Sequence, residues 1–304
     1  MHKNIKQKNN TDMKKILLFC YLSAKEYILL YHFLKHYKKL GVTEFHLTID
    51  CHNDENLKQR AGEITKDYNT VNTFVNKYNS NLKQDAVNKF INNNRSDSNW
   101  LVYVDLDEFI NLENSIGIDC KNLIELGDYL SSSKILAIRG YMFDKVNPEK
   151  IDTTLRLDVD ISETLSHYYP VCNNIRRRLN YNKSPFFLGT NQPIWNGSGF
   201  FFKGSHGSQA FKAYYKSEKY QSVCKNKFIV LDHYKWHKDS IEKLKERLII
   251  YKDSSSKVRI YNTHLSELKN IIENGYEKDL LTKNITDPKN LHPSTIEKDF
   301  TFKY

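Results

Sequence analysis

Residues 15–50 decide the fold, and their sequence is KILLFCYLSAKEYILLYHFLKHYKKLGVTEFHLTID. Residues 15–22 contain a short continuous apolar run, which is typical of a strand buried on both faces of a sheet. Apolar side chains then recur at helical spacing until Gly41, where we expect the helix to end. Residues 45–50 predict a second strand, which ends on Asp50. A strand, a helix and a second strand in this order predict two parallel strands joined by a helix.

The alternation of strands and helices continues to about residue 104. We expect helices near 54–67 and 81–93, and strands at 71–75 and 100–104. At the start of the first helix, an S-x-x-E pattern from Ser23 to Glu26 predicts a capping box. Strands that alternate with long helices predict an α/β fold, with a mostly parallel sheet flanked by helices. In such sheets ligands bind beyond the carboxyl ends of the strands.

The second half of the sequence is less regular. We expect strands at 135–143 and 228–231, helices at about 239–251 and 264–274, and irregular structure over 152–210. The sequence shows neither an internal repeat nor a linker, which favours a single domain with appended helices. The expected division is a flexible basic tail at 1–13, one α/β domain at 14–252 and a C-terminal helical extension at 253–304.

The composition is that of a folded globular protein. With 39% apolar and 13% aromatic residues, the chain differs from the composition of disordered proteins. No apolar run approaches the roughly 18 residues of a membrane span, so we expect none. The five cysteines stand singly, without a C-x-x-C pair, which favours reduced thiols and a cytoplasmic location.

The net charge of +10 is concentrated at the N-terminal end. Residues 1–40 carry nine Lys and two acidic residues, so seven of the ten net charges lie there. A basic face attracts anionic membranes, nucleic acid or phosphorylated small molecules. The sequence lacks the interleaved basic and aromatic residues of known nucleic-acid-binding modules. We therefore expect peripheral contact with the inner face of an anionic membrane, and no nucleic-acid partner.

The strongest chemical signal is WLVYVDLDEF at residues 100–109. An apolar strand leads directly into Asp105 and Asp107, two carboxylates that are two residues apart. At the end of a strand such a pair can converge on one hard cation, with the oxygen ligands that Mg²⁺ and Mn²⁺ prefer. Such a cation would hold the phosphates of a nucleotide and neutralise a departing diphosphate.

Several stretches together resemble family-2-like glycosyltransferases of the GT-A fold. YLSAKEYILLYHFLKHYKKLGVTEFHLTID at 21–50 is similar to their opening, and NWLVYVDLDEFI at 99–110 is similar to the metal-binding strand of a D-x-D-E-F subgroup. YNKSPFF at 181–187, GSH at 204–206 and LDHYKWH at 231–237 resemble later elements of that subgroup, in the same order. The resemblance covers about residues 14–250. It implies a GT-A fold, a nucleotide-sugar donor and a divalent metal, Mn²⁺ or Mg²⁺.

The resemblance also implies roles for individual residues. Those expected to bind the nucleotide-sugar are Asp50, Lys83, Asp105 and Lys183. Those expected to bind the metal are Asp105, Asp107 and a late histidine, for which His233 is the best match and His206 the alternative. His206 lies in a glycine-rich segment, where we expect it to act in catalysis on a moving lid over the donor. Further candidates are Gln84 beside Lys83, and a clamp for the diphosphate or for an acidic acceptor at Arg176, Arg177 and Arg178.

The sequence leaves the catalytic base open. No Glu-Asp pair stands out between residues 145 and 230, and the isolated candidates are Asp144, Asp158, Asp160 and Glu163. We expect an inverting, metal-dependent glycosyltransferase that moves a sugar from a nucleotide-sugar to a glycan or lipid-linked acceptor in surface polysaccharide synthesis. One alternative is a Mg²⁺-dependent nucleotidyl- or phosphotransferase, although no glycine-rich phosphate loop follows the first strand. Another is a non-enzymatic basic protein that binds anionic membrane or nucleic acid.

Overall fold

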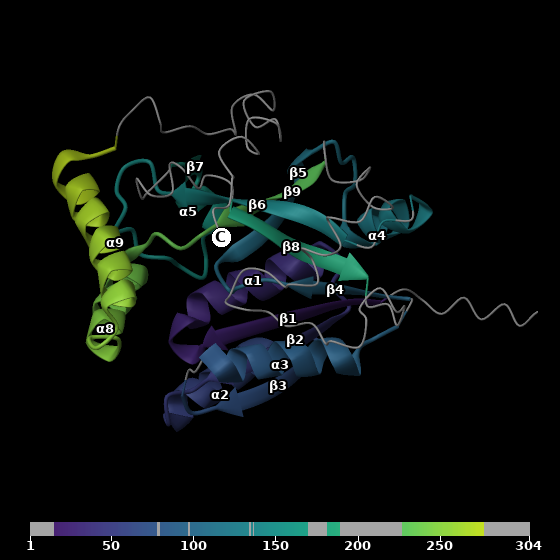
Figure 1. Ribbon diagram of the computed structural model, residues 1–304, viewed down its shortest axis with the longest axis horizontal. Coiled ribbons are helices and arrows are strands. Elements are labelled where there is room, and N and C mark those ends of the chain that lie inside the picture. The colour runs from purple at the N-terminus through teal and green to yellow at the C-terminus, as the bar shows by residue number, and fades with distance from the viewer. Residues whose placement is uncertain are drawn as a thin grey trace, which may run out of the picture.

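The computed structural model of the chain describes residues 15–77, 80–96, 98–133, 135, 137–169, 181–188 and 227–276. Only the backbone is described at 80, 137, 139, 141, 181–188, 228, 256 and 257. Nine strands of this part join one sheet (Figure 1). They are β1 Lys15–Ser23, β2 Glu44–Asp50, β3 Thr70–Val75, β4 Asn99–Tyr103, β5 Glu108–Ile116, β6 Ala137–Val146, β7 His167–Tyr168, β8 Tyr181–Leu188 and β9 Phe228–His233.

The strand order is β3-β2-β1-β4-β8-β6-β9-β5, with β7 paired to β6. Strands β3, β2, β1 and β4 form a parallel unit, and β6 and β9 pair in parallel with each other. Strand β8 runs antiparallel to both β4 and β6, so β6 and β9 run in the same direction as the parallel unit. The mostly parallel sheet expected of a GT-A fold is confirmed.

Helices flank this sheet. They are η1 Ala24–Glu26, α1 Tyr27–Lys39, α2 Glu55–Thr65, α3 Ser80–Asn93, α4 Leu123–Ser132, α5 Ile161–Thr164, α8 Lys238–Ile250 and α9 Ser255–Asn274. Helices α8 and α9 stand together at the left of Figure 1, on the side toward which β1 runs. No helix of the described ranges is both long enough and apolar enough to cross a bilayer.

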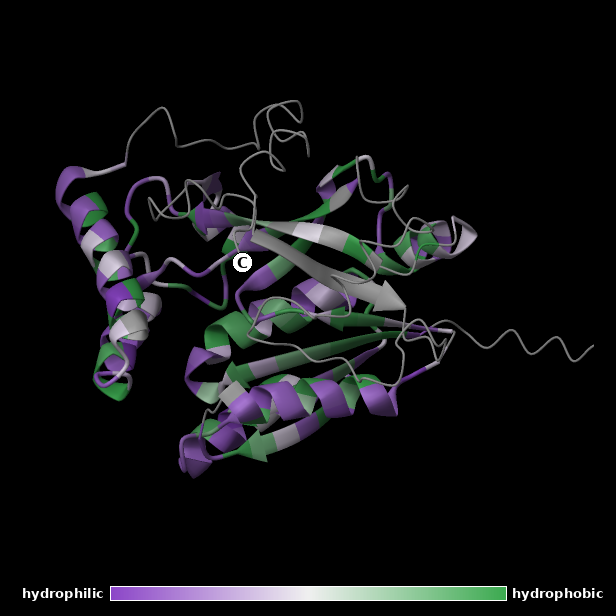
Figure 2. Ribbon diagram, viewed as in Figure 1, coloured by the Kyte–Doolittle hydropathy of each residue, from purple (hydrophilic) through white to green (hydrophobic). Residues whose placement is uncertain are grey.

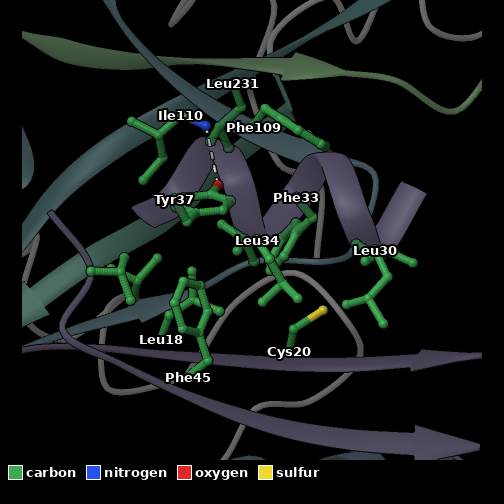
Figure 3. Close-up of a cluster of buried hydrophobic side chains, with 14 of the residues drawn as sticks. Leu18, Cys20, Leu30, Phe33, Leu34, Tyr37, Phe45, Phe109, Ile110 and Leu231 are labelled. Atoms are coloured by element: carbon green, nitrogen blue, oxygen red, sulfur yellow. Dashed lines mark hydrogen bonds between the residues drawn. The ribbon is translucent and has the colours of Figure 1, made fainter. Parts of the chain in front are cut away.

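The core lies on both faces of the parallel strands. Alternate residues of β1 divide between them: Leu18 and Cys20 pack with α1, whereas Leu17 and Phe19 pack with α3. Figure 3 shows the first of these clusters, where Phe33 of α1 and its neighbours lie over the strands. In Figure 2 the ribbons of the central strands are largely green, whereas the ribbon of α3 is mostly purple. A one-residue slip of β1 would exchange its two buried sets, so packing on both faces fixes its register.

The predicted capping box is not formed. The hydroxyl of Ser23 accepts a hydrogen bond from the Lys25 N–H at 3.3 Å, and a 3-10 turn precedes α1. The carboxylate of Glu26 instead accepts a hydrogen bond from Nζ of Lys243 in α8, at 2.6 Å. A long-range ion pair therefore replaces the local cap that the S-x-x-E pattern predicts.

Three strands lie where the sequence does not predict them. Strands β7 and β8 fall inside the stretch 152–210, for which we expected irregular structure, and β5 follows the D-x-D motif directly. All three depend on partners outside their own segments, since β7 pairs with β6, β8 pairs with β4 and β6, and β5 pairs with β9. Helix α9 also begins well before the expected residue 264.

Helices α8 and α9 pack on the second half of the sheet through their own apolar cluster. The buried members of this cluster are Val146, Ile151, Tyr169, Trp236, Leu244, Leu268 and Ile271. The cluster joins the end of β6 to both C-terminal helices. It therefore holds these helices next to the residues that follow β6 and β9.

Candidate functional site

Acidic residues gather at the carboxyl ends of the parallel strands. Asp50 is the last residue of β2 and pairs in register with Ser23, the last residue of β1. On the other side of β1, strand β4 ends at Tyr103, and Asp105 and Asp107 follow in the turn before β5. Because these strands are parallel, their ends share one edge of the sheet, where α/β proteins bind their ligands.

Glu108 closes the turn that presents the two aspartates. Its Oε2 accepts a hydrogen bond from the Asp105 N–H at 2.8 Å, and its own N–H donates to the Asp105 carbonyl at 3.0 Å. The hydroxyl of buried Tyr37 donates to the Glu108 carbonyl at 2.8 Å. It also accepts from the Ile110 N–H at 3.1 Å, which is the dashed line in Figure 3. Glu108 is only 1% exposed. The glutamate of the D-x-D-E-F motif is therefore a structural part of the turn.

Strand β9 brings a histidine to the second aspartate. His233 pairs in register with Glu108 of β5 on one side and with Asp144 of β6 on the other. The His233 Nε2 lies 3.4 Å from the Asp107 Oδ2, and the His233 Nδ1 lies 2.6 Å from the Asp144 Oδ1. The N–H of the following residue, Tyr234, donates to the Asp107 carbonyl at 2.8 Å. Two of the three residues predicted to bind metal are thus adjacent.

The charges of this cluster stabilise one another. Burial alone would lower the pKa of His233, but the carboxylates of Asp107 and Asp144 outweigh it and raise that pKa to about 10. Burial alone would raise the pKa of Asp107, but His233, with Lys243 and Lys235 farther away, holds it well below its usual range. Without a metal the pair is therefore an imidazolium and a carboxylate. A divalent cation would displace the proton on Nε2.

Asp105, the first aspartate of the motif, forms an ion pair with a lysine of helix α3. Nζ of Lys83, on α3, donates to the Asp105 Oδ1 at 2.6 Å, and both side chains are mostly buried. The structure thus joins two residues that the sequence assigns to the nucleotide-sugar. It does not place Asp105 in one cluster with His233: among the described residues, no group of three or more His, Cys, Asp or Glu side chains is arranged to hold a metal ion.

Asp50 offers an acceptor atom at the same edge. Its side chain is 1% exposed, and its Oδ1 accepts a hydrogen bond from the His52 N–H at 3.0 Å. Its Oδ2 is buried, makes no hydrogen bond among the described residues, and lies 3.7 Å from the Nε2 of His52. A buried carboxylate oxygen without a hydrogen bond costs free energy, so a donor from a ligand would stabilise it.

The C-terminal helices reach this edge, which the sequence does not indicate. Besides the Lys243–Glu26 pair, Nζ of Lys25 lies 3.4 Å from Oε1 of Glu246 in α8. The ring of His264 in α9 packs edge-on against Trp236, with 5.7 Å between centroids. These contacts join sequence-distant segments, so only the folded chain reveals them.

The remaining predicted residues are placed as follows. His206 and Arg176, Arg177 and Arg178 lie outside the described residues, and Gln84 lies on α3. The backbone of Lys183 lies in β8, opposite Gly140. Of the candidate bases, Asp158 is exposed and pairs with Arg156, Asp160 caps α5, and Glu163 lies within α5. Asp144 is the candidate base that lies beside His233.

Asp107 and His233 together fit a divalent cation. A carboxylate oxygen and an imidazole nitrogen 3.4 Å apart can move onto one ion. Carboxylate oxygens suit both Mg²⁺ and Mn²⁺, whereas an imidazole nitrogen is a ligand typical of transition metals. Mg²⁺ usually keeps several waters and binds one or two carboxylates together with substrate phosphates. A site with two protein ligands therefore suits a metal that arrives with a nucleotide.

No protein-family model and no curated protein matches the chain. Among solved structures, it is similar to S. aureus TarS at 13% identity and a TM-score of 0.34, over 87% of this chain and 44% of TarS. The shorter TarS 1-349, in complex with UDP, gives 13% identity and a TM-score of 0.39, over 84% of this chain and 71% of that one. A 4-diphosphocytidyl-2C-methyl-D-erythritol synthase from Anaerococcus prevotii has 13% sequence identity and a TM-score of 0.32. The match covers 71% of this chain and 87% of that one. The match thus spans less than half the length of the first of these TarS chains.

Proposed function

We propose that the chain is a metal-dependent glycosyltransferase, which moves a sugar from a nucleotide-sugar to a hydroxyl of a glycan or lipid-linked acceptor. The observation that carries the proposal is the approach of Asp107 Oδ2 to His233 Nε2, 3.4 Å apart, beside the carboxyl edge of the sheet. Asp50 and the Lys83–Asp105 pair lie at that edge as well. The D-x-D-E-F resemblance favours a nucleotide-sugar over other nucleotides.

In this proposal different residues of the site bind the nucleoside, the diphosphate and the metal. The Oδ2 of Asp50, which makes no hydrogen bond among the described residues, accepts one from the nucleoside. Lys83 provides a cation near the diphosphate, and Asp105, which it orients, faces the ribose. Asp107 and His233 would hold Mn²⁺ or Mg²⁺, and such a cation would supply positive charge for a departing diphosphate.

Transfer then replaces one bond at the anomeric carbon by another. The acceptor oxygen forms a bond to that carbon from the face opposite the diphosphate, the bond from carbon to the diphosphate oxygen breaks, and the sugar configuration inverts. A base takes the proton of the acceptor hydroxyl. We propose that His206 acts close to the donor in this step, on the segment Gly204 to Gly207.

A further part of the proposal concerns the acceptor. The nine lysines of residues 1–40 would attract an anionic leaflet that carries a lipid-linked acceptor. Each lysine near such a surface contributes about 1 kcal/mol, and salt weakens the attraction. Sedimentation with anionic vesicles should therefore show binding at low ionic strength that is lost when salt is added.

The test of the proposed function is the product released from a panel of nucleotide-sugars incubated with the full chain and Mn²⁺. A glycosyltransferase releases a nucleoside diphosphate, by slow hydrolysis when no acceptor is present. A nucleotidyltransferase would release no nucleoside diphosphate from these donors and would instead release pyrophosphate in a parallel incubation with a nucleoside triphosphate and a sugar phosphate. A binding protein would release neither. Asp107→Asn should lower the release about 100-fold or more, because the amide loses the charge that binds metal. Asp119→Asn, an exposed aspartate, is the matched control and should leave the release unchanged.

A further inference from the structure

Asp144 and His233 form a contact that the site does not yet account for. Asp144 lies near the end of β6, is 6% exposed, and pairs in register with His233 across the parallel β6–β9 ladder. Its Oδ1 lies 2.6 Å from the His233 Nδ1. An ionised carboxylate only accepts hydrogen bonds, so Nδ1 carries the hydrogen and donates it.

That hydrogen bond decides which ring nitrogen can bind a cation. With its hydrogen held on Nδ1, a neutral His233 has its lone pair on Nε2, the nitrogen that lies 3.4 Å from Asp107. The contact also fixes the rotation of the ring about its bond to Cβ. Histidines that ligate metals usually donate their other N–H to a carboxylate or carbonyl in this way.

The backbone on both sides of this contact is itself held in place. The N–H of Tyr169 donates to the Asp144 carbonyl at 3.1 Å, which fixes the end of β6. On β9, the carboxylate of Asp232 accepts hydrogen bonds from the Tyr168 hydroxyl at 2.7 Å and from the Asn111 amide at 2.8 Å. The ring and the carboxylate therefore meet on rigid strands, as a preorganised metal ligand requires.

We propose that Asp144 is a positioning residue: it fixes the tautomer and orientation of His233, so that Nε2 and Asp107 hold the divalent cation. The inference rests on the proposed function and takes Asp144 out of the set of candidate bases. A base must meet the hydroxyl of an incoming acceptor, whereas the side chain of Asp144 is 4% exposed, against 27% for Asp107.

The test compares Asp144→Ala with Asp144→Asn. The dissociation constant of Mn²⁺ is measured by calorimetry with a nucleoside diphosphate present, and circular dichroism checks that each variant is folded. Asp144→Ala should raise the constant about 10- to 100-fold, the usual effect of removing such a partner. The asparagine side chain of Asp144→Asn has the size of aspartate and keeps one acceptor oxygen. This variant should therefore bind Mn²⁺ much more tightly than Asp144→Ala and nearly as tightly as the wild type. Asp119→Asn, at an exposed aspartate outside the candidate site, is the control and should change nothing.

A second measurement needs neither metal nor turnover. In ¹⁵N-labelled protein, the proton on His233 Nδ1 should resonate far downfield because it is donated to a carboxylate, and Asp144→Ala should abolish that signal. If the signal is absent from the wild type, or if the alanine variant keeps the wild-type Mn²⁺ affinity, the proposal is overturned.

Turnover separates positioning from base catalysis. A positioning role predicts that Asp144→Asn approaches wild-type turnover at saturating Mn²⁺. Loss of turnover at saturating metal, with unchanged Mn²⁺ affinity in both variants, would instead identify Asp144 as the base and overturn the proposal. A wild-type protein that shows the downfield signal but binds no Mn²⁺ would refute the proposed function itself, and the metal role of Asp144 with it.

Discussion

Replacing Tyr37 by Phe removes one oxygen atom from beneath the D-x-D turn. The Tyr37 hydroxyl bonds to two main-chain groups of β5, the Glu108 carbonyl at 2.8 Å and the Ile110 N–H at 3.1 Å. Tyr37 and both partner residues are buried, so water cannot replace the lost bonds. An unsatisfied buried polar group costs about 1–3 kcal/mol, and the two groups together should lower the free energy of unfolding by about 2–4 kcal/mol.

Thermal unfolding followed by circular dichroism measures this loss. In a chain of this size 1 kcal/mol shifts Tm by roughly 2 °C, so Tyr37→Phe should lower Tm by about 4–8 °C. The matched control is Tyr31→Phe on the same helix, whose hydroxyl makes no hydrogen bond among the described residues. Its Tm should stay within about 1 °C of the wild type. Equal shifts for the two variants, or no shift for Tyr37→Phe, would refute the argument that Tyr37 anchors the turn.

Three further predictions concern packing, nucleotide binding and pH. Gly127→Ala should lower the free energy of unfolding by about 1–3 kcal/mol, because its Cβ would lie 2.9 Å from a buried indole ring, whereas Gly62→Ala, with no atom within 4 Å, should not destabilise the chain. Lys83→Met should raise the Kd of a nucleoside diphosphate about 10- to 100-fold in calorimetry, and Lys89→Met, exposed on the same helix, should leave it unchanged. Burial lowers the pKa of His36 to about 4 from 6.5. As the pH falls, the unfolded chain therefore binds a proton at His36 at a higher pH than the folded chain does. Stability should therefore fall as the pH drops from 6.5 to 4, by up to about 3 kcal/mol, and His36→Gln should flatten that fall in denaturation curves; an unchanged slope would contradict it.

The first half of the fold can be predicted from the sequence because its signals are local. The apolar run of β1, the helical spacing of α1 and the end of that helix at Gly41, with φ of 94°, all follow from neighbouring residues. Strand β5 is different. Its sequence EFINLENSI mixes polar and apolar residues, and its strand conformation depends on pairing with β9, more than a hundred residues later.

Some features of the candidate site can likewise be predicted from local sequence, whereas others depend on contacts between distant segments. The D-x-D motif is visible in the sequence because both aspartates follow one apolar strand. His233 could be selected because an apolar strand, β9, leads into it. The contact between Asp144 and His233 could not be predicted, because it depends on the register of β6 against β9. The same holds for the pair of Glu26 and Lys243, whose partners are 217 residues apart.

Pulsed electron paramagnetic resonance of bound Mn²⁺ tests the central claim most directly, because it detects a nitrogen nucleus coordinated to the ion. With Mn²⁺ and a nucleoside diphosphate, the wild-type protein should show coupling to one imidazole nitrogen. The coupling should vanish in His233→Ala and persist in His52→Ala, a histidine beside Asp50 at the same edge. A wild-type spectrum without nitrogen coupling would contradict the account. So would coupling that survives in His233→Ala, and its loss in His206→Ala would then assign the ligand to that histidine.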